Sequence, residues 1–328
     1  MTMSDSLSIM ADIGGTNTRV ALARNLEILT DSICRYKNAE YSGLEVIFAK
    51  YLADHPDVKP DAASAAIAGP VRDGKGTLTN LDWTIDRELL RRATGATTVS
   101  VINDLQAQGH AVEHLTDDKV EHIQNGNIVD AHAARLVVGV GTGFNAAPVF
   151  RTDNMTLIPP AECGHVDLPT PYDDQKRFAS DFASKNGFCS VEDALSGRGL
   201  THIYSWIAKE AGSVRRKTAP EIMSACEDNS DSLAMDTIQF FSRALGTVCG
   251  NLALSLLPFG GIYLVGGVAR AVTPYLKDNG FVESFQDKGR FSEFSKQFPV
   301  YVVDDDYAAL TGMAALLHEL RNGPPQRA

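Results

Sequence analysis

The chain has 328 residues, 44% of them hydrophobic and 22% charged, which is typical of a globular protein long enough for two domains. Its net charge of −11 excludes nucleic acid as a main partner, because binding a phosphate backbone requires clustered Lys and Arg. The five cysteines are widely spaced, and neither a signal peptide nor a bilayer-spanning run is evident. These features predict a cytoplasmic protein with no membrane partner.

The first predicted elements form a hairpin with a polar turn. An apolar strand near residues 7–11 runs into Asp12, and a second strand returns near residues 19–23. The turn contains Gly14, Gly15, Thr16 and Asn17. Glycine lets the backbone approach an anion, and successive N–H groups with a Thr hydroxyl hold phosphate oxygens. Asp12 stands where a hard cation bound to those phosphates would need a carboxylate. An ordinary hairpin turn is the alternative.

Strands and helices alternate in the rest of the first half. We predict strands near residues 62–68 and 99–102, and helices over 42–53, with Ser42 and Glu45 as a capping box, and over 86–94, ended by Gly95. The strand 99–102 runs into Asn103 and Asp104. Strand ends in α/β folds collect site residues, although both residues also favour the cap of a helix.

The second half repeats this plan after a polar, turn-rich stretch over residues 117–134, which we interpret as a crossing between lobes. A strand near 136–140 enters the turn Gly141, Thr142 and Gly143, and a strand returns near 146–150. A later buried strand ends at Gly266 and Gly267, where close backbone approach would suit a flat adenosine. Helices are predicted over 235–257 and 307–320.

In their order and spacing, these motifs resemble those of the bacterial-type glucokinases, in the superfamily of sugar kinases, actin and Hsp70-like ATPases. The matching segments are 12–22, 78–83, 102–105, 139–143, 162–167, 192–200, 251–254, 261–268 and 287–291. The resemblance implies an α/β, two-lobed actin-like ATPase (ribonuclease H-like) fold with a cleft between the lobes. We expect a small α/β domain of residues 1–114 plus 305–328 and a large α/β domain of residues 115–304.

The resemblance also implies ATP-dependent phosphorylation of the 6-hydroxyl of glucose, giving glucose 6-phosphate and ADP, by a homodimer that uses Mg²⁺. Asp104 would be the general base, since a carboxylate can accept the proton that the attacking hydroxyl loses. Asn103 would orient a sugar hydroxyl, and Asn80 would contact the sugar or shape the wall of its site. Glu162, His165 and Glu192 would hold the sugar. The alternatives for these three are a surface acid, a structural histidine and a first-turn helix acid.

The nucleotide contacts that the resemblance implies lie on the three glycine turns. They are Asp12, which would bind Mg²⁺ through water, and Gly14, Gly15, Thr16, Asn17, Gly141, Thr142, Gly143, Gly266 and Gly267. Three residues depart from the family pattern. Ala161 and Cys163 stand in the sugar segment where glycines are usual, and Asn145 replaces a common glycine. These departures affect the expected sugar selectivity and the detail of the phosphate loop.

Two other functions are open at this point. His110, Glu113 and His114 spell an inverted zinc-peptidase motif, although the glucokinases simply have a helix there. A non-catalytic sugar sensor on the same fold would keep the sugar residues and could discard the base.

Overall fold

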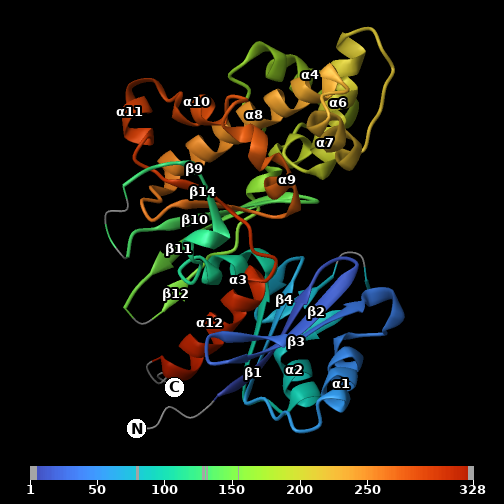
Figure 1. Ribbon diagram of the computed structural model, residues 1–328, viewed down its shortest axis with the longest axis vertical. Helices are drawn as coiled ribbons and strands as arrows, with labels where there is room; N and C mark the ends of the chain where they lie inside the picture. Colours follow the sequence, from blue (N-terminus) through green and yellow to red (C-terminus); the bar gives the residue numbers. More distant parts are fainter. Residues whose placement is uncertain (1–5, 79–80, 128–129, 131, 154, 324–328) are drawn as a thin grey trace. The chain divides into compact units, whose positions relative to one another are not determined.

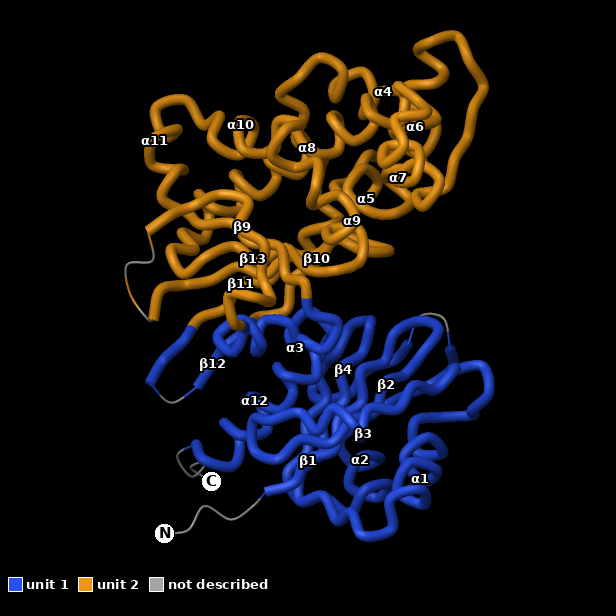
Figure 2. The backbone as a smooth tube through the Cα atoms, viewed as in Figure 1, with its two compact units in different colours: residues 1–115, 151–158, 305–328 blue, residues 116–150, 159–304 orange. Residues whose placement is uncertain are grey.

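The computed structural model describes residues 6–78, 81–127, 130, 132–153 and 155–323, and the chain forms two compact units. The first unit comprises residues 1–115, 151–158 and 305–328, and the second comprises 116–150 and 159–304 (Figure 2). The expected large domain of residues 115–304 includes the segment 151–158. This segment instead lies in the first unit, where Thr156 donates its N–H and its hydroxyl to Glu319, at 3.0 and 2.7 Å.

The first unit is built around a sheet with the strand order β3-β2-β1-β4-β8 (Figure 1). Its strands are β1 (Leu7–Ile13), β2 (Asn17–Arg24), β3 (Glu27–Lys37), β4 (Ala62–Ile67) and β8 (Thr98–Asn103). Its helices are α1 (Leu44–Asp54), α2 (Arg87–Thr94), α3 (Asp104–Ala111) and α12 (Ala308–Asn322). Smaller strands are β5 (Val71–Arg72), β6 (Lys75–Thr77), β7 (Thr84–Asp86) and β12 (Thr156–Leu157). β1 is antiparallel to β2 and parallel to β4, which is parallel to β8.

Helices cover both faces of this sheet, because successive side chains of a strand point to opposite faces. Ile9, Ala11 and Ile13 belong to one buried cluster with residues of α1 and α2, whereas Met10 belongs to another with residues of α3 and α12. α3 and α12 cross closely: a Cβ atom on Gly312 would lie 1.8 Å from the Ala107 carbonyl oxygen. The strand ends are therefore held between two packed helix layers.

The second unit also contains a hairpin followed by parallel strands, and it has more helices than the first unit. Its sheet has the order β11-β10-β13-β14-β9. The strands are β9 (Val120–Gln124), β10 (Arg135–Val140), β11 (Phe144–Arg151), β13 (Ile262–Val265) and β14 (Val300–Val303). The α-helices are α4 (Asp173–Asn186), α5 (Val191–Ala194), α6 (Gly197–Glu210), α7 (Ala219–Glu227), α8 (Ser232–Leu256), α9 (Gly267–Leu276), α10 (Phe281–Gln286) and α11 (Ser292–Ser295). α8 is mostly buried and lies in the core of this unit, as its apolar sequence predicts.

Two local predictions are wrong. The predicted capping box of Ser42 and Glu45 does not form, because α1 begins after Gly43 and has no side-chain cap. The polar stretch 117–134 is not only a connection: it contains β9, which pairs antiparallel with β14. β9 is an edge strand with exposed polar side chains, so its sequence lacks the alternating apolar pattern of a half-buried strand.

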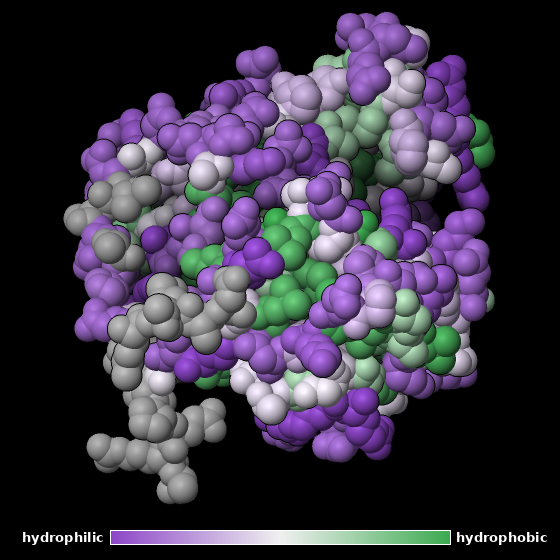
Figure 3. Space-filling view, turned by 60° about the horizontal axis from the view of Figure 1, so that its bottom comes forward, coloured by the Kyte–Doolittle hydropathy of each residue, from purple (hydrophilic) through white to green (hydrophobic). Residues whose placement is uncertain are grey.

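On the face drawn in Figure 3, hydrophilic side chains cover most of the area and apolar ones form smaller patches. Among the residues described, no helix combines the length and apolar character needed to cross a membrane.

Candidate active site

Asp12 and Asp104 lie at the same edge of the first sheet. β1, β4 and β8 are neighbouring parallel strands, and their register aligns Ile13 with Ile67 and Ile67 with Asn103. The carboxyl ends of these strands therefore bring Asp12, which precedes Ile13, and Asp104, which follows Asn103, to one edge. The predicted base and the predicted phosphate turn share the first unit.

Asn103 caps α3. Its Oδ1 accepts the Leu105 N–H at 2.9 Å, and its own N–H donates to Gln106 Oε1 at 3.0 Å, which completes a capping box. Its Nδ2 donates to the Gly69 carbonyl at 2.9 Å. The cap considered as an alternative for Asn103 is therefore present, and it fixes the first turn of α3 at the end of β8.

Asp104 is half-buried in that first turn. One of its oxygens accepts the Leu105 N–H at 2.8 Å. Burial raises the pKa of Asp104 to about 6, and the negative charge of Asp12 contributes in the same direction. A carboxylate with a pKa near neutrality is suited to accepting a proton.

The turn between β1 and β2 is held by hydrogen bonds and lines a hollow of about 230 Å³. The Gly14 N–H donates to the Asn17 carbonyl at 3.0 Å, and Asn38 Nδ2 donates to the Gly14 carbonyl at 2.8 Å. All five residues predicted to bind phosphate and Mg²⁺ line the hollow: Asp12, Gly14, Gly15, Thr16 and Asn17. Two arginines, Arg19 and Arg35, complete the lining. Sequence reasoning missed Arg35 and Asn38, because both follow the hairpin at a distance and belong to no recognised motif.

The acidic residue of this hollow fits a hydrated cation. Burial raises the pKa of Asp12, while the positive charge of Arg19, 3.6 Å away, lowers it. A buried carboxylate is stabilised in its charged form by a positive charge nearby, so a cation bound beside Asp12 would be favoured in addition to Arg19. Mg²⁺ commonly binds one or two carboxylates and keeps several waters, so a single Asp12 is sufficient.

The second unit holds Glu192 in the first turn of α5. Its Oε2 accepts the Phe144 N–H at 3.0 Å, and its Oε1 accepts from Arg198 at 2.9 Å. A Cβ atom on Gly143 would lie 2.4 Å from Glu192 Oε2. Glycine at this position therefore lets the carboxylate reach the end of the Gly141–Gly143 turn.

Glu162 and His165 lie on an exposed loop beside Glu192. A 3-10 turn over Cys163–His165 presents both side chains to solvent. A Cβ atom on Gly164 would lie 3.5 Å from Glu192 Cβ and 2.0 Å from the Phe144 carbonyl oxygen. The structure thus brings the three predicted sugar residues together in the second unit.

Asn145 anchors this loop. Its Nδ2 donates to the Ala161 carbonyl at 2.5 Å, and its Oδ1 accepts the Cys163 N–H at 3.0 Å and the Ala146 N–H at 2.8 Å. The departure from the family's common glycine therefore adds a side-chain brace between β11 and the sugar loop.

Gly266 requires glycine for two reasons. Its φ is 107°, and a Cβ atom would lie 2.5 Å from the Val140 carbonyl oxygen. Gly267 is exposed and begins α9. The end of β13 therefore offers bare backbone next to the end of β10.

The remaining predictions concern Asn80 and the zinc-peptidase motif. Asn80 lies outside the described residues. His110 is buried in α3, while Glu113 and His114 follow the end of that helix, and Glu113 forms an ion pair with Arg151. Burial lowers the pKa of His110 to about 4. Among the residues that the structure describes, no group of three His, Cys, Asp or Glu side chains is arranged to hold a metal.

Comparison with known proteins identifies close relatives over most of the chain. A family model described as Glucokinase matches residues 9–320. A glucokinase of Rhizobium etli is 32% identical over 94% of this chain and 90% of its own length, and one of Hahella chejuensis is 32% identical over 94% and 96%.

Solved structures agree. A glucokinase from an Antarctic psychrotroph superimposes with a TM-score of 0.87 at 30% identity, covering 96% of this chain and 99% of that one. A glucokinase of Balamuthia mandrillaris in complex with glucose has a TM-score of 0.78 at 22% identity, over 97% and 94%. The match at 22% identity bears on the fold alone. Together with the match at 30% identity, it assigns this chain the two-lobed actin-like ATPase fold.

Proposed function

Because the chain belongs to the glucokinase family, we propose that it transfers the γ-phosphoryl group of ATP to the 6-hydroxyl of glucose with Asp104 as the general base. The oxygen of the hydroxyl attacks the γ-phosphorus, the bond to the bridging oxygen of the β-phosphate breaks, and ADP leaves. The hydroxyl proton passes to Asp104. The products are glucose 6-phosphate and ADP.

The observation that carries this proposal is the position of Asp104 after the end of β8, at the edge of the sheet that also bears the phosphate turn. Burial there raises the pKa of Asp104 to about 6. At neutral pH such a carboxyl is mostly deprotonated yet binds a proton more readily than an ordinary aspartate. Asn103 is proposed to orient a sugar hydroxyl through the remaining acceptor position of its Oδ1. Phosphoryl transfer needs little more than this base, positioning and charge stabilisation.

We propose that Glu162, His165 and Glu192 bind the hydroxyls of the sugar ring. Glu192 is held by Phe144 N–H and Arg198, and Glu162 and His165 lie on the adjacent loop. Carboxylates accept from hydroxyls, and an imidazole either donates or accepts, so the set can recognise several hydroxyls at once. Asn80 remains a proposed sugar contact on the strength of the resemblance alone.

We propose that the phosphates of ATP bind at the turn from Gly14 to Asn17, with Arg19 and Arg35 contributing positive charge. Asp12 would hold Mg²⁺ through water, and the ion, when bound, neutralises charge on the β- and γ-phosphates. In the second unit, Gly141, Thr142, Gly143, Gly266 and Gly267 are the proposed nucleotide contacts. A ROK family glucokinase of Streptomyces griseus has been solved with glucose and AMPPNP, which supports a triphosphate as the donor.

Two further proposals concern the cellular compartment and the oligomeric state of the protein. The five cysteines, three of them buried, are all free thiols, which supports a reducing compartment such as the cytoplasm. The homodimer rests on the family resemblance, and light scattering on the purified protein tests it.

The activity is tested by measuring ADP release with ATP and Mg²⁺ over a panel of hexoses, with glucose 6-phosphate dehydrogenase identifying the product. We expect sugar-dependent ADP release that is highest with glucose and lost in Asp104→Asn. Asp57→Asn, which changes an exposed acid of the same unit, serves as the matched control. Binding of glucose without turnover would instead indicate a sugar sensor, and sugar-independent ADP release would contradict the proposal.

A further inference from the structure

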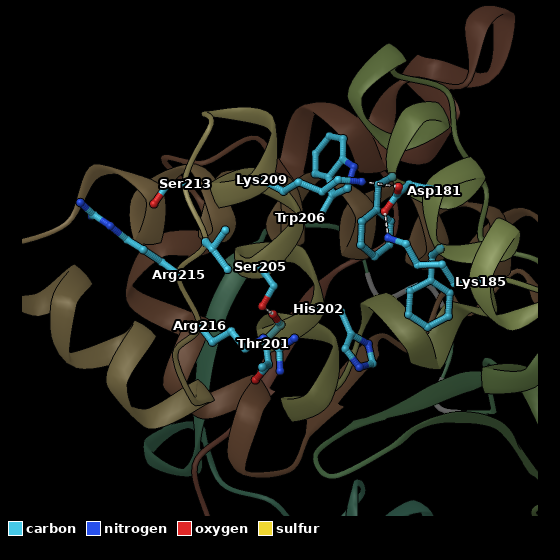
Figure 4. Close-up of a pocket in the computed structure, with 13 residues that line it drawn as sticks. Asp181, Lys185, Thr201, His202, Ser205, Trp206, Lys209, Ser213, Arg215 and Arg216 are labelled. Atoms are coloured by element: carbon cyan, nitrogen blue, oxygen red, sulfur yellow. Dashed lines mark hydrogen bonds and ion pairs between the residues drawn. The ribbon is translucent and has the colours of Figure 1, made fainter.

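The second unit carries a hollow of about 650 Å³ that contains none of the predicted site residues. Its walls are α4, α6 and the loop over residues 213–216 (Figure 4). Hollows of several hundred Å³ are typical of small-molecule sites. This one lies wholly within a single unit and is separate from the proposed sugar and nucleotide contacts.

Four aromatic rings line part of the hollow, those of Phe178, Phe182, His202 and Trp206. Phe178 and Trp206 are buried and pack edge to face, with ring centroids 5.7 Å apart. Phe182 and His202 form a tilted pair 5.1 Å apart and are only half-buried. Such rings favour a flat apolar group, because aromatic pairs gain energy beyond the area that they bury.

The rim of the hollow is positively charged. Lys185 and Lys209 both pair with Asp181, the latter at 2.8 Å (Figure 4). Arg216 points across the hollow toward α6, whereas Arg215 points away (Figure 4). No hydrogen bond or ion pair of Arg216 occurs within the described part of the chain. One carboxylate thus faces three cations, in a protein whose net charge is −11, which makes the hollow locally attractive to an anion.

We propose that this hollow is a second ligand site, which binds an anion with a flat aromatic body, such as an aryl phosphate. The aromatic body lies against Phe182 and His202, and the anionic group is bound by Arg216 with Lys185 and Lys209. Guanidinium groups bind phosphate in a bidentate manner, and this favours Arg216 as the principal contact.

Titration calorimetry with 1-naphthyl phosphate tests the proposal. We expect one site per chain besides any contribution of the nucleotide site, with affinity about tenfold or more above that of 1-naphthol and of inorganic phosphate, since each lacks half of the recognised chemistry. Arg216→Glu should weaken this site by about tenfold or more, and Lys176→Glu should not. Lys176 is an exposed lysine of α4 that pairs with Asp173 and does not line the hollow.

A second variant removes the space rather than the charge. Ser205 lines the hollow from α6 and is half-buried, so Ser205→Phe should fill it and abolish binding while the ATP KM stays unchanged. The proposal is overturned if the probe does not bind, if inorganic phosphate binds as tightly, or if both Arg216→Glu and Ser205→Phe bind it as the unchanged protein does.

Discussion

Asp104 of the first unit and Glu192 of the second begin from the same local structure and end in different environments. Each is an acid in the first turn of a helix that follows a capping residue, Asn103 or Ser190. Glu192 is held by a cation and a backbone N–H. Asp104 accepts the Leu105 N–H, has no ion pair within the described residues, and lies near the like charge of Asp12. Partners beyond the helix therefore separate the proposed proton acceptor, Asp104, from the proposed sugar ligand, Glu192.

The largest effect is expected for Asp104→Asn. Removing a general base costs about 10²–10⁴-fold in rate, so kcat should fall by that factor while glucose binding is retained. Steady-state kinetics and calorimetric titration with glucose measure the two quantities separately. A near-normal kcat would show that Asp104 is not the base.

The thermal stability of Asp104→Asn shows whether its loss of activity comes from the missing base or from unfolding. The pKa of Asp104 rises from 3.8 to about 6 in the folded protein. Above pH 6 the folded protein therefore holds an unfavourable negative charge, which lowers the free energy of unfolding by at most about 3 kcal/mol. This cost disappears as the pH falls from 6 to 3.8. Asp104→Asn should therefore raise the Tm at pH 7.5, whereas a lower Tm would indicate a structural role.

Glu192→Gln should act on sugar binding rather than on the chemical step. It removes the charge paired with Arg198 and one acceptor, and an unpaired buried polar group costs about 1–3 kcal/mol. We expect the glucose KM to rise by about 5- to 150-fold with the ATP KM unchanged, and smaller effects of the same kind for Glu162→Gln and His165→Ala. Glu210→Gln, on the exposed end of α6, is the control. A rise in the ATP KM instead would assign these residues to another site.

The pH profile sharpens the comparison between the two acids. Asp104 accepts a proton only when deprotonated, so kcat/KM for glucose should fall about tenfold per pH unit below a midpoint near 6. Glu192→Gln should lower the whole curve and leave this midpoint in place. A flat profile between pH 5 and 7 would remove Asp104 from the proton transfer.

The smallest effect is expected at Asn145, which supports the sugar loop without itself being a proposed sugar contact. Asn145→Gly restores the residue that the family commonly has and deletes the hydrogen bonds to Ala161 and Cys163. Each such bond contributes about 1 kcal/mol, so the glucose KM should rise by at most about 30-fold while kcat is retained. Asn186→Gly, at the exposed end of α4, is the control. An unchanged KM would show that the loop holds its position without this brace.

Much of the first unit could be predicted from local sequence. The hairpin at Asp12, the helix ended by Gly95 and the strand entering Asn103 each carry their own signal of apolar runs, turn glycines or caps. β9 could not be predicted, because its pairing with β14 joins segments about 180 residues apart and its edge position does not require an apolar face.

The candidate site likewise contains residues that local sequence identifies and residues that only the fold brings in. The motif residues were identifiable from residue type and spacing, but Asn38, Arg35 and Arg198 were not, since tertiary contacts alone bring them to the phosphate turn and to Glu192. The pKa of Asp104 depends on burial and on Asp12, which the sequence places 92 positions earlier. Environment, rather than residue type, separates the two acids.

The close crossing of α3 and α12 has a consequence for biosynthesis. α12 supplies Leu310, Met313 and Leu317 to a core that also contains Met10, yet about 300 residues separate the two ends of that core. The ribosome therefore completes the second unit before the last helix of the first unit exists. During that interval the face of the sheet opposite α1 and α2 is covered by α3 but not by α12. Apolar surface left exposed in this way makes a nascent chain prone to aggregation and a target for chaperones.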